Sequence, residues 1–430
     1  MKLSAPSLGR PAILLAALGA ALVSAPRQAV AERGPGWSLG RHLSGSQQLL
    51  DDPGGARTRL EQLGIVAQLF YQHFVSWKPP GGGVASSGAF GHSASYDLFG
   101  LVDAEELVGW PGLDLLVRAR GLYGRNLNDE VGALSDPIDD ADFDAPIYVD
   151  ELWLEQALLD DRVRVRLGML EQQTLFDRNA YANSEDIQFL ATFLDNDGVV
   201  PLPRGLGAAL LVTPVKWLDV ALGAVDADNP SRSAGFDTAF DGLDSLTGYL
   251  ELRFRSRLPS RAGELPGAFR LGAFLDGRDR TVFGETHQGT GLPKTQRGHP
   301  GAYLSFDQLA FREGPDSEQG LGLFARFGWA DEDVNRVAWF WSVGARYLGL
   351  APTREADVLG LGIYQAIGSE RYRDLQDRDF EGETGIEVYY QIAALRWLAL
   401  TPDLQIILDP GGDEAADDAV VATLRVRVSF

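Results

Sequence analysis

The chain has 430 residues, of which 60 are acidic and 38 basic, so its formal net charge at pH 7 is −22. This excess of acid argues against nucleic acid as a partner, because binding to phosphates depends on basic side chains. The absence of cysteine excludes disulfides and thiolate metal sites, and the 50 glycines, 21 phenylalanines, 12 tyrosines and 9 tryptophans are more typical of strands and turns than of helices.

Residues 1–31 have the features of a secretory signal peptide. Lys2 and Arg10 give a basic start, residues 12–23 are apolar, and residues 29–31 (Ala-Val-Ala) offer a cleavage site. Cleavage there would leave 35 basic and 60 acidic residues, a net charge of −25. No later segment approaches the roughly 20 apolar residues of a transmembrane helix, so the sequence excludes a helical membrane protein.

The exported chain is predicted to have two parts. Residues 32–63 are expected to form an N-terminal periplasmic segment, and residues 64–430 a single β-barrel domain. Within the first part, residues 51–64 have a helical pattern, and Asp52 is placed to cap a short helix in or under the periplasmic mouth.

From residue 64 onwards, apolar and polar residues alternate in one segment after another, which is typical of strands with lipid on one side and water on the other. The predicted strands are 64–76, 94–107, 113–124, 148–158, 162–171, 206–213, 217–226, 246–257, 267–276, 300–312, 320–330, 337–349, 355–366, 384–393, 396–407 and 418–430. These segments make an even-numbered set of about 16 antiparallel strands, as bacterial outer-membrane barrels have. The segment 187–194 resembles a strand but lies in a long connection, so we exclude it.

The predicted connections alternate in length. Long connections fall at 77–93, 125–147, 172–205, 227–245, 277–299 and 367–382, and short ones at 108–112, 159–161, 214–216, 350–354 and 394–395. The connection at 331–336 is short where a long one is expected. Short periplasmic turns and long extracellular loops alternate in this way in outer-membrane barrels, with both termini in the periplasm.

The side-chain pattern indicates which face of each strand meets the membrane. In the last strand, Leu424 is expected to face outward, and Arg425 inward. In the strand 337–349, Trp339 and Trp341 share the outward parity, as an aromatic girdle requires. Strands in a membrane must close into a barrel because no water satisfies a free edge, and about 16 strands enclose an aqueous channel. A soluble barrel is the alternative, but arginines would then line a dry interior.

Several segments, in order along the chain, are similar to those of the carbohydrate-selective porins of the OprB type. They are GGARTRLEQLGI at 54–65, VDAEELVGWPG at 102–112, YVDELWLEQALLDDRVRVRLGMLE at 148–171, AYLSFDQLAFRE at 302–313, GLGLFARFGWA at 320–330, GLAPTREADVLGLG at 349–362, ETGIEVYYQIAALRWLALTPDLQIILDPGG and the terminal DDAVVATLRVRVSF. The resemblance runs from about Pro53 to Phe430 and departs from the family at Asp409, where asparagine is common. It implies a sixteen-strand barrel, a pore narrowed by an inward-folded loop, and passive uptake of mono- or small oligosaccharides, with no cofactor and no enzymatic activity.

Strand parity assigns a set of charged and aromatic side chains to the lumen as candidates for contact with a sugar. They are Arg118, Arg120, Glu151, Trp153, Glu155, Arg164, Arg166, Arg253, Arg255, Arg270, Tyr303, Asp307, Arg326, Arg346, Glu387, Arg425 and Arg427. Guanidinium groups donate hydrogen bonds and carboxylates accept them, so a wall of both can hold hydroxyl groups. The alternative is that these groups pair with one another and keep the wall hydrated.

The connection 172–205 is the candidate constriction. Its apolar middle, 187–194, is flanked by Asp186, Asp195 and Asp197. An apolar loop is costly in water, so we expect it to fold into the barrel. Packing over a neighbouring subunit is the alternative.

We assign no metal site. The acidic run Asp139, Asp140, Asp142 and Asp144 and the segment 195–198 lack the spacing of a calcium loop. We interpret them as surface charge, in contact with lipopolysaccharide through divalent ions. Other expected partners are outer-membrane lipids and the assembly machinery that reads the C-terminal strand, while a monomer and a trimer both remain open.

Three other functions are alternatives. An outer-membrane hydrolase would need a serine and histidine with an orienting partner, which the sequence does not reveal. A structural barrel with a blocked lumen is disfavoured by inward glycines that we interpret as open space, namely Gly322, Gly328, Gly344, Gly360 and Gly362. A general or anion-selective porin for small solutes is the nearest rival.

Overall fold

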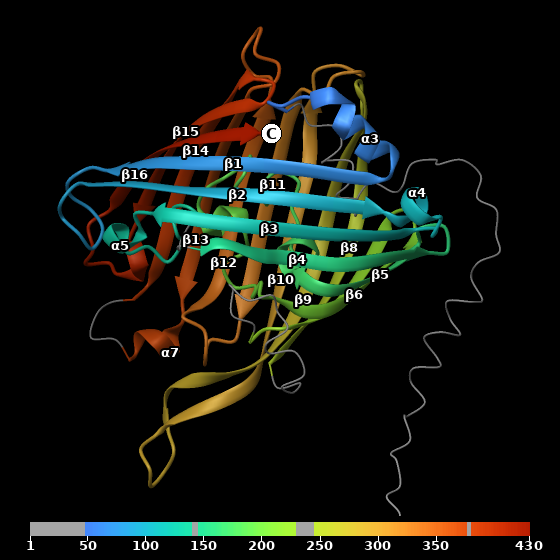
Figure 1. The fold of residues 1–430 in the computed structure, drawn as a ribbon. Helices are drawn as coiled ribbons and strands as arrows, with labels where there is room; N and C mark the ends of the chain where they lie inside the picture. Colours follow the sequence, from blue (N-terminus) through green and yellow to red (C-terminus); the bar gives the residue numbers. More distant parts are fainter. Residues whose placement is uncertain (1–47, 140–144, 229–244, 376–379) are drawn as a thin grey trace, which may run out of the picture. The chain divides into compact units, whose positions relative to one another are not determined.

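The computed structural model describes residues 48–139, 145–228, 245–375 and 380–430 (Figure 1). The described residues form one closed antiparallel barrel in which every strand pairs with its neighbours in sequence and β16 pairs with β1. The predicted signal peptide, 1–31, lies outside the described residues, as does the first half of the segment 32–63.

The strands confirm the predicted order and number. They are β1 (Ile65–Lys78), β2 (Ala89–Asp103), β3 (Leu113–Arg125), β4 (Ala145–Leu158), β5 (Val163–Glu171), β6 (Arg204–Val215), β7 (Leu218–Asp226), β8 (Leu246–Ser260), β9 (Gly263–Thr286), β10 (Pro293–Arg312), β11 (Gly320–Ala330), β12 (Val337–Leu348), β13 (Val358–Gly368), β14 (Gly382–Leu395), β15 (Leu398–Leu408) and β16 (Ala419–Ser429).

The helices among the described residues are short, and none is long and apolar enough to cross a membrane. They are η1 (Pro53–Gly55), α3 (Ala56–Gln62), α4 (Ala104–Val108), α5 (Asn128–Val131), η2 (Gln172–Thr174), α6 (Thr192–Asp195), α7 (Glu370–Arg373) and η3 (Pro410–Gly412).

The predicted helix before the first strand is present as η1 and α3. Asp52 accepts a hydrogen bond from the backbone N–H of Arg57 at 2.9 Å and from the hydroxyl of Thr58 at 2.7 Å. Gly55, and not the predicted Asp52, occupies the N-cap position of α3, and Asp52 contacts the first turn of α3 from three residues earlier. The helix lies beside β1 (Figure 1).

Several predicted strand boundaries were wrong, most of all in β2, β9 and β10. The end of the predicted strand 94–107 is the helix α4, because the Asp103 carboxylate accepts the first N–H groups of a helical turn. Most of the predicted loop 277–299 is strand, because β9 and β10 continue as a hairpin that projects past the neighbouring strands (Figure 1). Most side chains of this hairpin are polar, and its few large apolar residues, Val282, Phe283 and Leu292, do not alternate with polar ones, so no period-two pattern reveals it.

The alternation of exposure along the strands confirms which side chains face outward. On β16, Leu424 is 40% exposed whereas Arg425 is 1% exposed. On β12, Trp339 is 42% exposed and Phe340 is fully buried. Outward side chains are thus apolar and uncovered, while inward ones are covered by other parts of the chain.

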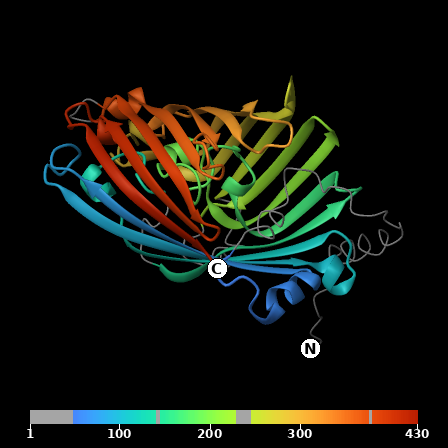
Figure 2. The same cartoon turned by 90° about the horizontal axis from the view of Figure 1, so that it is seen from above.

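The two ends of the barrel differ. At the end that carries α3, α4 and the C-terminus, which we call the short-turn end, β6 and β7, β8 and β9, and β14 and β15 are each joined by two residues. The opposite, long-loop end carries α5 and α7 (Figure 1). The connection between β5 and β6, residues 172–203, starts there and lies inside the ring of strands, where Figure 2 shows it in green.

Candidate functional site

The structure places the predicted lumen residues on the inward face of their strands. Those that are buried are Arg118, Arg120, Glu151, Trp153, Glu155, Arg164, Arg166, Arg270, Tyr303, Asp307, Arg326, Glu387 and Arg425. Those that are partly buried are Arg253, Arg255, Arg346 and Arg427. Their contact with a sugar stays a prediction, and their contacts with one another separate them into groups.

One group is an ion-pair cluster on β4 and β5. Glu155 accepts hydrogen bonds from Arg164 at 2.8 Å and from Arg166 at 2.9 Å. The Arg166 guanidinium lies 3.9 Å from the centre of the Trp153 ring, and the indole N–H of Trp153 donates to Glu151 at 2.9 Å. These side chains use one another as hydrogen-bond donors and acceptors, which fits the alternative that paired ions form the wall.

A second group links β2, β3, β5 and β6. Arg118 lies 2.8 Å from the Asp97 carboxylate and 3.0 Å from that of Glu171. Glu171 also accepts from Arg204 at 2.9 Å. Three members of this cluster, Asp97, Glu171 and Arg204, were absent from the predicted set, although the inward parity of Asp97 on its strand was a usable signal.

Further ion pairs lie on β7 to β10. Arg255 and Asp219 are joined by two hydrogen bonds, one of 2.8 Å and one of 2.6 Å. Arg270 and Asp307 also form a buried pair. Each of these four groups is therefore neutralised by its partner.

The connection 172–203 folds into the barrel, as predicted from its apolar middle. Phe189, Leu190 and Leu194 are fully buried, and Phe189 packs edge-to-face on Tyr389 of β14 with ring centres 5.1 Å apart. Packing of this apolar segment against the barrel wall removes it from water, and burying it over a neighbouring subunit is not needed.

Wall carboxylates hold this infolded loop by its backbone. Glu387 accepts the N–H groups of Leu190 and Ala191, the latter at 2.9 Å. Glu251 accepts the N–H of Asp177 at 2.9 Å and the hydroxyl of Tyr303 at 2.8 Å. Buried carboxylates that receive such donors anchor a loop in one position.

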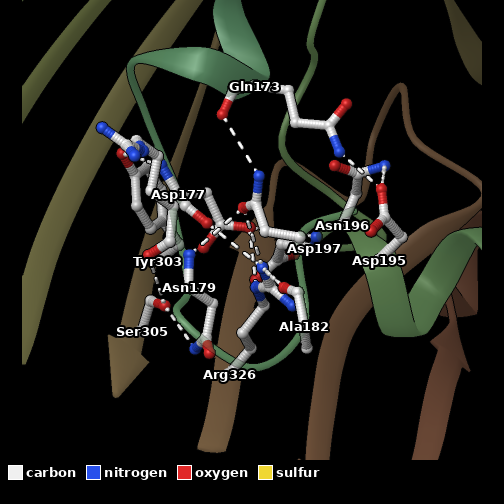
Figure 3. A network of polar contacts seen from close by, with 12 residues as sticks. Gln173, Asp177, Asn179, Ala182, Asp195, Asn196, Asp197, Tyr303, Ser305 and Arg326 are labelled. Carbon is white, nitrogen blue, oxygen red and sulfur yellow. Dashed lines mark hydrogen bonds and ion pairs between the residues drawn. The ribbon is translucent and has the colours of Figure 1, made fainter. Parts of the chain in front are cut away.

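Arg326 on β11 lies at the centre of the loop network (Figure 3). Its guanidinium donates to the carbonyls of Leu194 at 3.1 Å, Asp177 at 3.2 Å and Ala182, and its Nε lies 3.0 Å from the Asp177 carboxylate. The side chain is 0% exposed. Arg326 therefore holds the loop against the barrel wall, and the loop in turn buries the Arg326 side chain.

The three aspartates that flank the apolar segment have different positions. Asp186 is partly buried and accepts a hydrogen bond from Gln72, whereas Asp195 and Asp197 are buried within the loop. Burial and the nearby Glu185 and Asp139 carboxylates raise the pKa of Asp195 well above its ordinary value.

Three carboxylates lie close together near the infolded loop. The carboxylate oxygens of Asp139, Glu185 and Asp195 are within 4.8 Å of one another. Of the acidic run noted in the sequence, Asp140, Asp142 and Asp144 lie outside the described residues.

A second infolded segment, residues 134–138, was missed by sequence reasoning. The N–H groups of Leu134 and Ser135 donate to Glu383 of β14, and the Ser135 hydroxyl accepts the N–H of Phe193 at 3.0 Å. Ile138 is 1% exposed. The apolar Leu134 and Ile138 within a long loop were the signal that could have revealed it.

The interpretation of the inward glycines as open space was wrong. A Cβ on Gly322 would lie 2.3 Å from the ring of Tyr181, and one on Gly362 would lie 2.9 Å from Phe189 and Leu194. The loop thus fills the space that these glycines leave. Gly328 similarly faces Asp197 of the loop, while Gly344 and Gly360 face aromatic rings of the wall.

Among the described residues, four of the predicted inward arginines form no ion pair, and one of them, Arg425, instead donates to carbonyls of the loop. Arg253 and Arg346 have no hydrogen-bond acceptor for their buried Nε atoms. Arg427 lies with its guanidinium 4.2 Å from the centre of the Phe70 ring and donates to the Ser429 hydroxyl at 3.4 Å. The other three guanidinium groups keep unused donors that a solute could occupy.

Comparisons with known proteins agree with this architecture. The chain is 24% identical to Porin B of Pseudomonas aeruginosa over 426 residues, which covers 90% of this chain and 92% of that protein. It is 22% identical to the putative porin QuiX of Acinetobacter baylyi, with 92% and 94% covered. The high-pH structure of Pseudomonas putida OprB has the same fold, with a TM-score of 0.80 at 22% identity over 90% of this chain and 99% of that one.

A family match covers most of the barrel. Residues 92–430 match the family described as carbohydrate-selective porin, OprB family. This match decides between the carbohydrate porin and its rivals, the hydrolase, the structural barrel and the general or anion-selective porin. The chain belongs to the OprB family of carbohydrate-selective porins, which are outer-membrane channels and not enzymes.

Proposed function

We propose that small sugars diffuse passively through a passage between the infolded loop and the barrel wall. The observation that carries this proposal is the buried anchoring of the loop. Glu387 and Arg326 hold the loop inside the lumen, while Arg253, Arg346 and Arg427 keep donors free. A narrowed passage with unused donors favours a solute that offers hydroxyl acceptors.

The mixture of charges on the wall favours neutral solutes over ions. Arg255 with Asp219 and Arg270 with Asp307 cancel locally, so the wall carries little net charge at these places. Such a wall offers donors and acceptors to a polyol but no strong field to an ion. Binding must also stay weak, because a tightly held sugar would leave slowly.

Export and placement in the membrane follow from the same hypothesis. Residues 1–31 act as the signal peptide, residues 32–63 remain in the periplasm, and the short-turn end faces the periplasm. Lipopolysaccharide meets the acidic long loops, and the assembly machinery reads β16. The exposed aromatic belt is compatible with a monomer or a trimer.

The experiment is a measurement of ion current through the full-length protein in planar bilayers, titrated with glucose and with a disaccharide. We expect millimolar inhibition by glucose, weakened when Arg253, Arg346 and Arg427 are replaced together by alanine. Arg257→Ala is the matched control, because Arg257 is exposed at the β8–β9 turn, where it pairs with Glu264. Arg164→Ala with Arg166→Ala should have a smaller effect, since both guanidinium groups are already bound to a carboxylate.

A different current response would contradict the proposal. If the current were indifferent to every sugar but blocked by phosphate, the passage would select anions. If the triple variant kept the inhibition of the wild type, other side chains would have to hold the sugar.

A further inference from the structure

A cavity of about 260 Å³ lies between the infolded loop and the short-turn end of the barrel. Tyr181 of the loop lines it, together with Arg312 at the end of β10, Ser317 and Glu318 of the β10–β11 turn, and Arg346 on β12. A solute that has passed the loop would meet this cavity before leaving at the short-turn end.

Tyr181 is held firmly in this cavity. Its ring lies over Gly322, where a Cβ would come within 2.3 Å of two ring carbons, so only glycine permits this position. The N–H of Tyr181 donates to the Asn179 side chain at 3.1 Å, and that side chain donates to the carbonyl of Phe306 at 2.9 Å. Burial raises the pKa of Tyr181 to about 12, and its hydroxyl is protonated at neutral pH, as it is in an ordinary tyrosine, and can donate.

The guanidinium groups of the cavity have donors to spare. Arg346 forms no ion pair among the described residues, and its Nε is buried without an acceptor. Within the same part of the chain that the structure describes, Arg312 donates only to the carbonyl of Ala262, at 3.4 Å. Ser317 and the exposed Glu318 add a hydroxyl and a carboxylate to the rim. An aromatic ring beside unused donors and acceptors is suited to a hydroxylated ring.

We propose that this cavity is a second sugar-binding subsite on the short-turn side of the infolded loop. A single pyranose ring packs against Tyr181, and its hydroxyl groups accept hydrogen bonds from Arg312 and Arg346. The inference rests on the proposed function and adds to it a resting place for one sugar unit after the narrow passage.

The test uses the absence of native cysteine, which makes an engineered thiol unique. Ser317→Cys is placed in the full-length protein in planar bilayers, and the rate of its modification by a water-soluble thiol reagent is measured with and without glucose. At a glucose concentration about ten times its dissociation constant, occupancy should slow the modification about tenfold. Ser260→Cys, at the β8–β9 turn and outside the cavity, should be modified at an unchanged rate.

A second substitution tests whether the ring of Tyr181 is the surface that contacts the sugar. Tyr181→Ala added to Ser317→Cys should abolish the protection, because the surface for the sugar is lost. Tyr347→Ala should retain it, since Tyr347 follows Arg346 on β12 with the opposite, outward parity.

The outcomes separate the two proposals. If glucose inhibits the current of the Ser317→Cys variant but does not protect its thiol, the subsite is refuted while the proposed function stands. A thiol at position 317 that no reagent reaches would also refute it, because the cavity would then be closed to solutes. If glucose has no effect on current, the proposed function itself fails.

Discussion

Replacing Arg326 with alanine is expected to release the infolded loop while the barrel stays folded. The Arg326 guanidinium donates to three loop carbonyls and pairs with Asp177, all inside the lumen. Alanine would leave those carbonyls without this donor and the Asp177 carboxylate without its counter-charge.

The magnitude follows from the burial of this pair. Breaking a buried ion pair by removing one partner costs about 3–5 kcal/mol. Because the partners of Arg326 all belong to the loop, the cost falls on loop docking and not on strand pairing. A penalty of that size shifts the equilibrium between the docked and the released loop toward the released loop by more than a factor of about 100.

Two assays check this prediction. Single-channel conductance should rise as the lumen widens, and a protease should cut the variant within 172–203, while heat-modifiable migration stays that of a folded barrel. Arg257→Ala is the control, because the Arg257 side chain is exposed and pairs with Glu264 instead of with a residue of the loop. Wild-type conductance together with a protease-resistant loop in the Arg326 variant would refute the reasoning.

Three further predictions concern the membrane face, the loop and the closing strand. Leu424→Arg should destabilise the barrel by about 2–4 kcal/mol near the midplane. Arg425→Leu should leave the barrel stable and loosen only the loop carbonyls that Arg425 binds. Equal urea midpoints of unfolding for the two variants would contradict this prediction. Because the pKa of Asp195 is raised in the docked loop, docking is most stable below the ordinary pKa of an aspartate and weakens as the pH rises through the raised value. Protease cleavage should therefore increase with pH in the wild type, and a similar increase in Asp195→Asn would count against this origin. Deleting residues 428–430 removes the bond from the Phe430 N–H to the Leu69 carbonyl and part of the β1–β16 ladder, so heat-modifiable barrel should vanish from the membrane fraction; normal levels would disprove the requirement.

The barrel could be predicted from the sequence because lipid and water impose opposite demands on adjacent residues. Leu424 and Arg425 illustrate this, since one must meet hydrocarbon and the other must avoid it. The same rule predicted the inward face of Arg326 and Glu387, and the apolar segment 187–194 predicted an infolded loop. The polar hairpin of β9 and β10 escaped the rule, because both of its faces meet water.

What each inward side chain contacts was decided only by the tertiary structure. Arg326 and Arg346 have the same parity on adjacent strands, yet the first is covered by the loop and the second keeps free donors. From the sequence, Gly322 was predicted to face open space in the lumen, but the ring of Tyr181 packs over it. Period-two alternation shows only which face of the strand a side chain occupies. The residue that this side chain contacts belongs to a loop far away in the chain, and the path of that loop depends on packing inside the closed barrel.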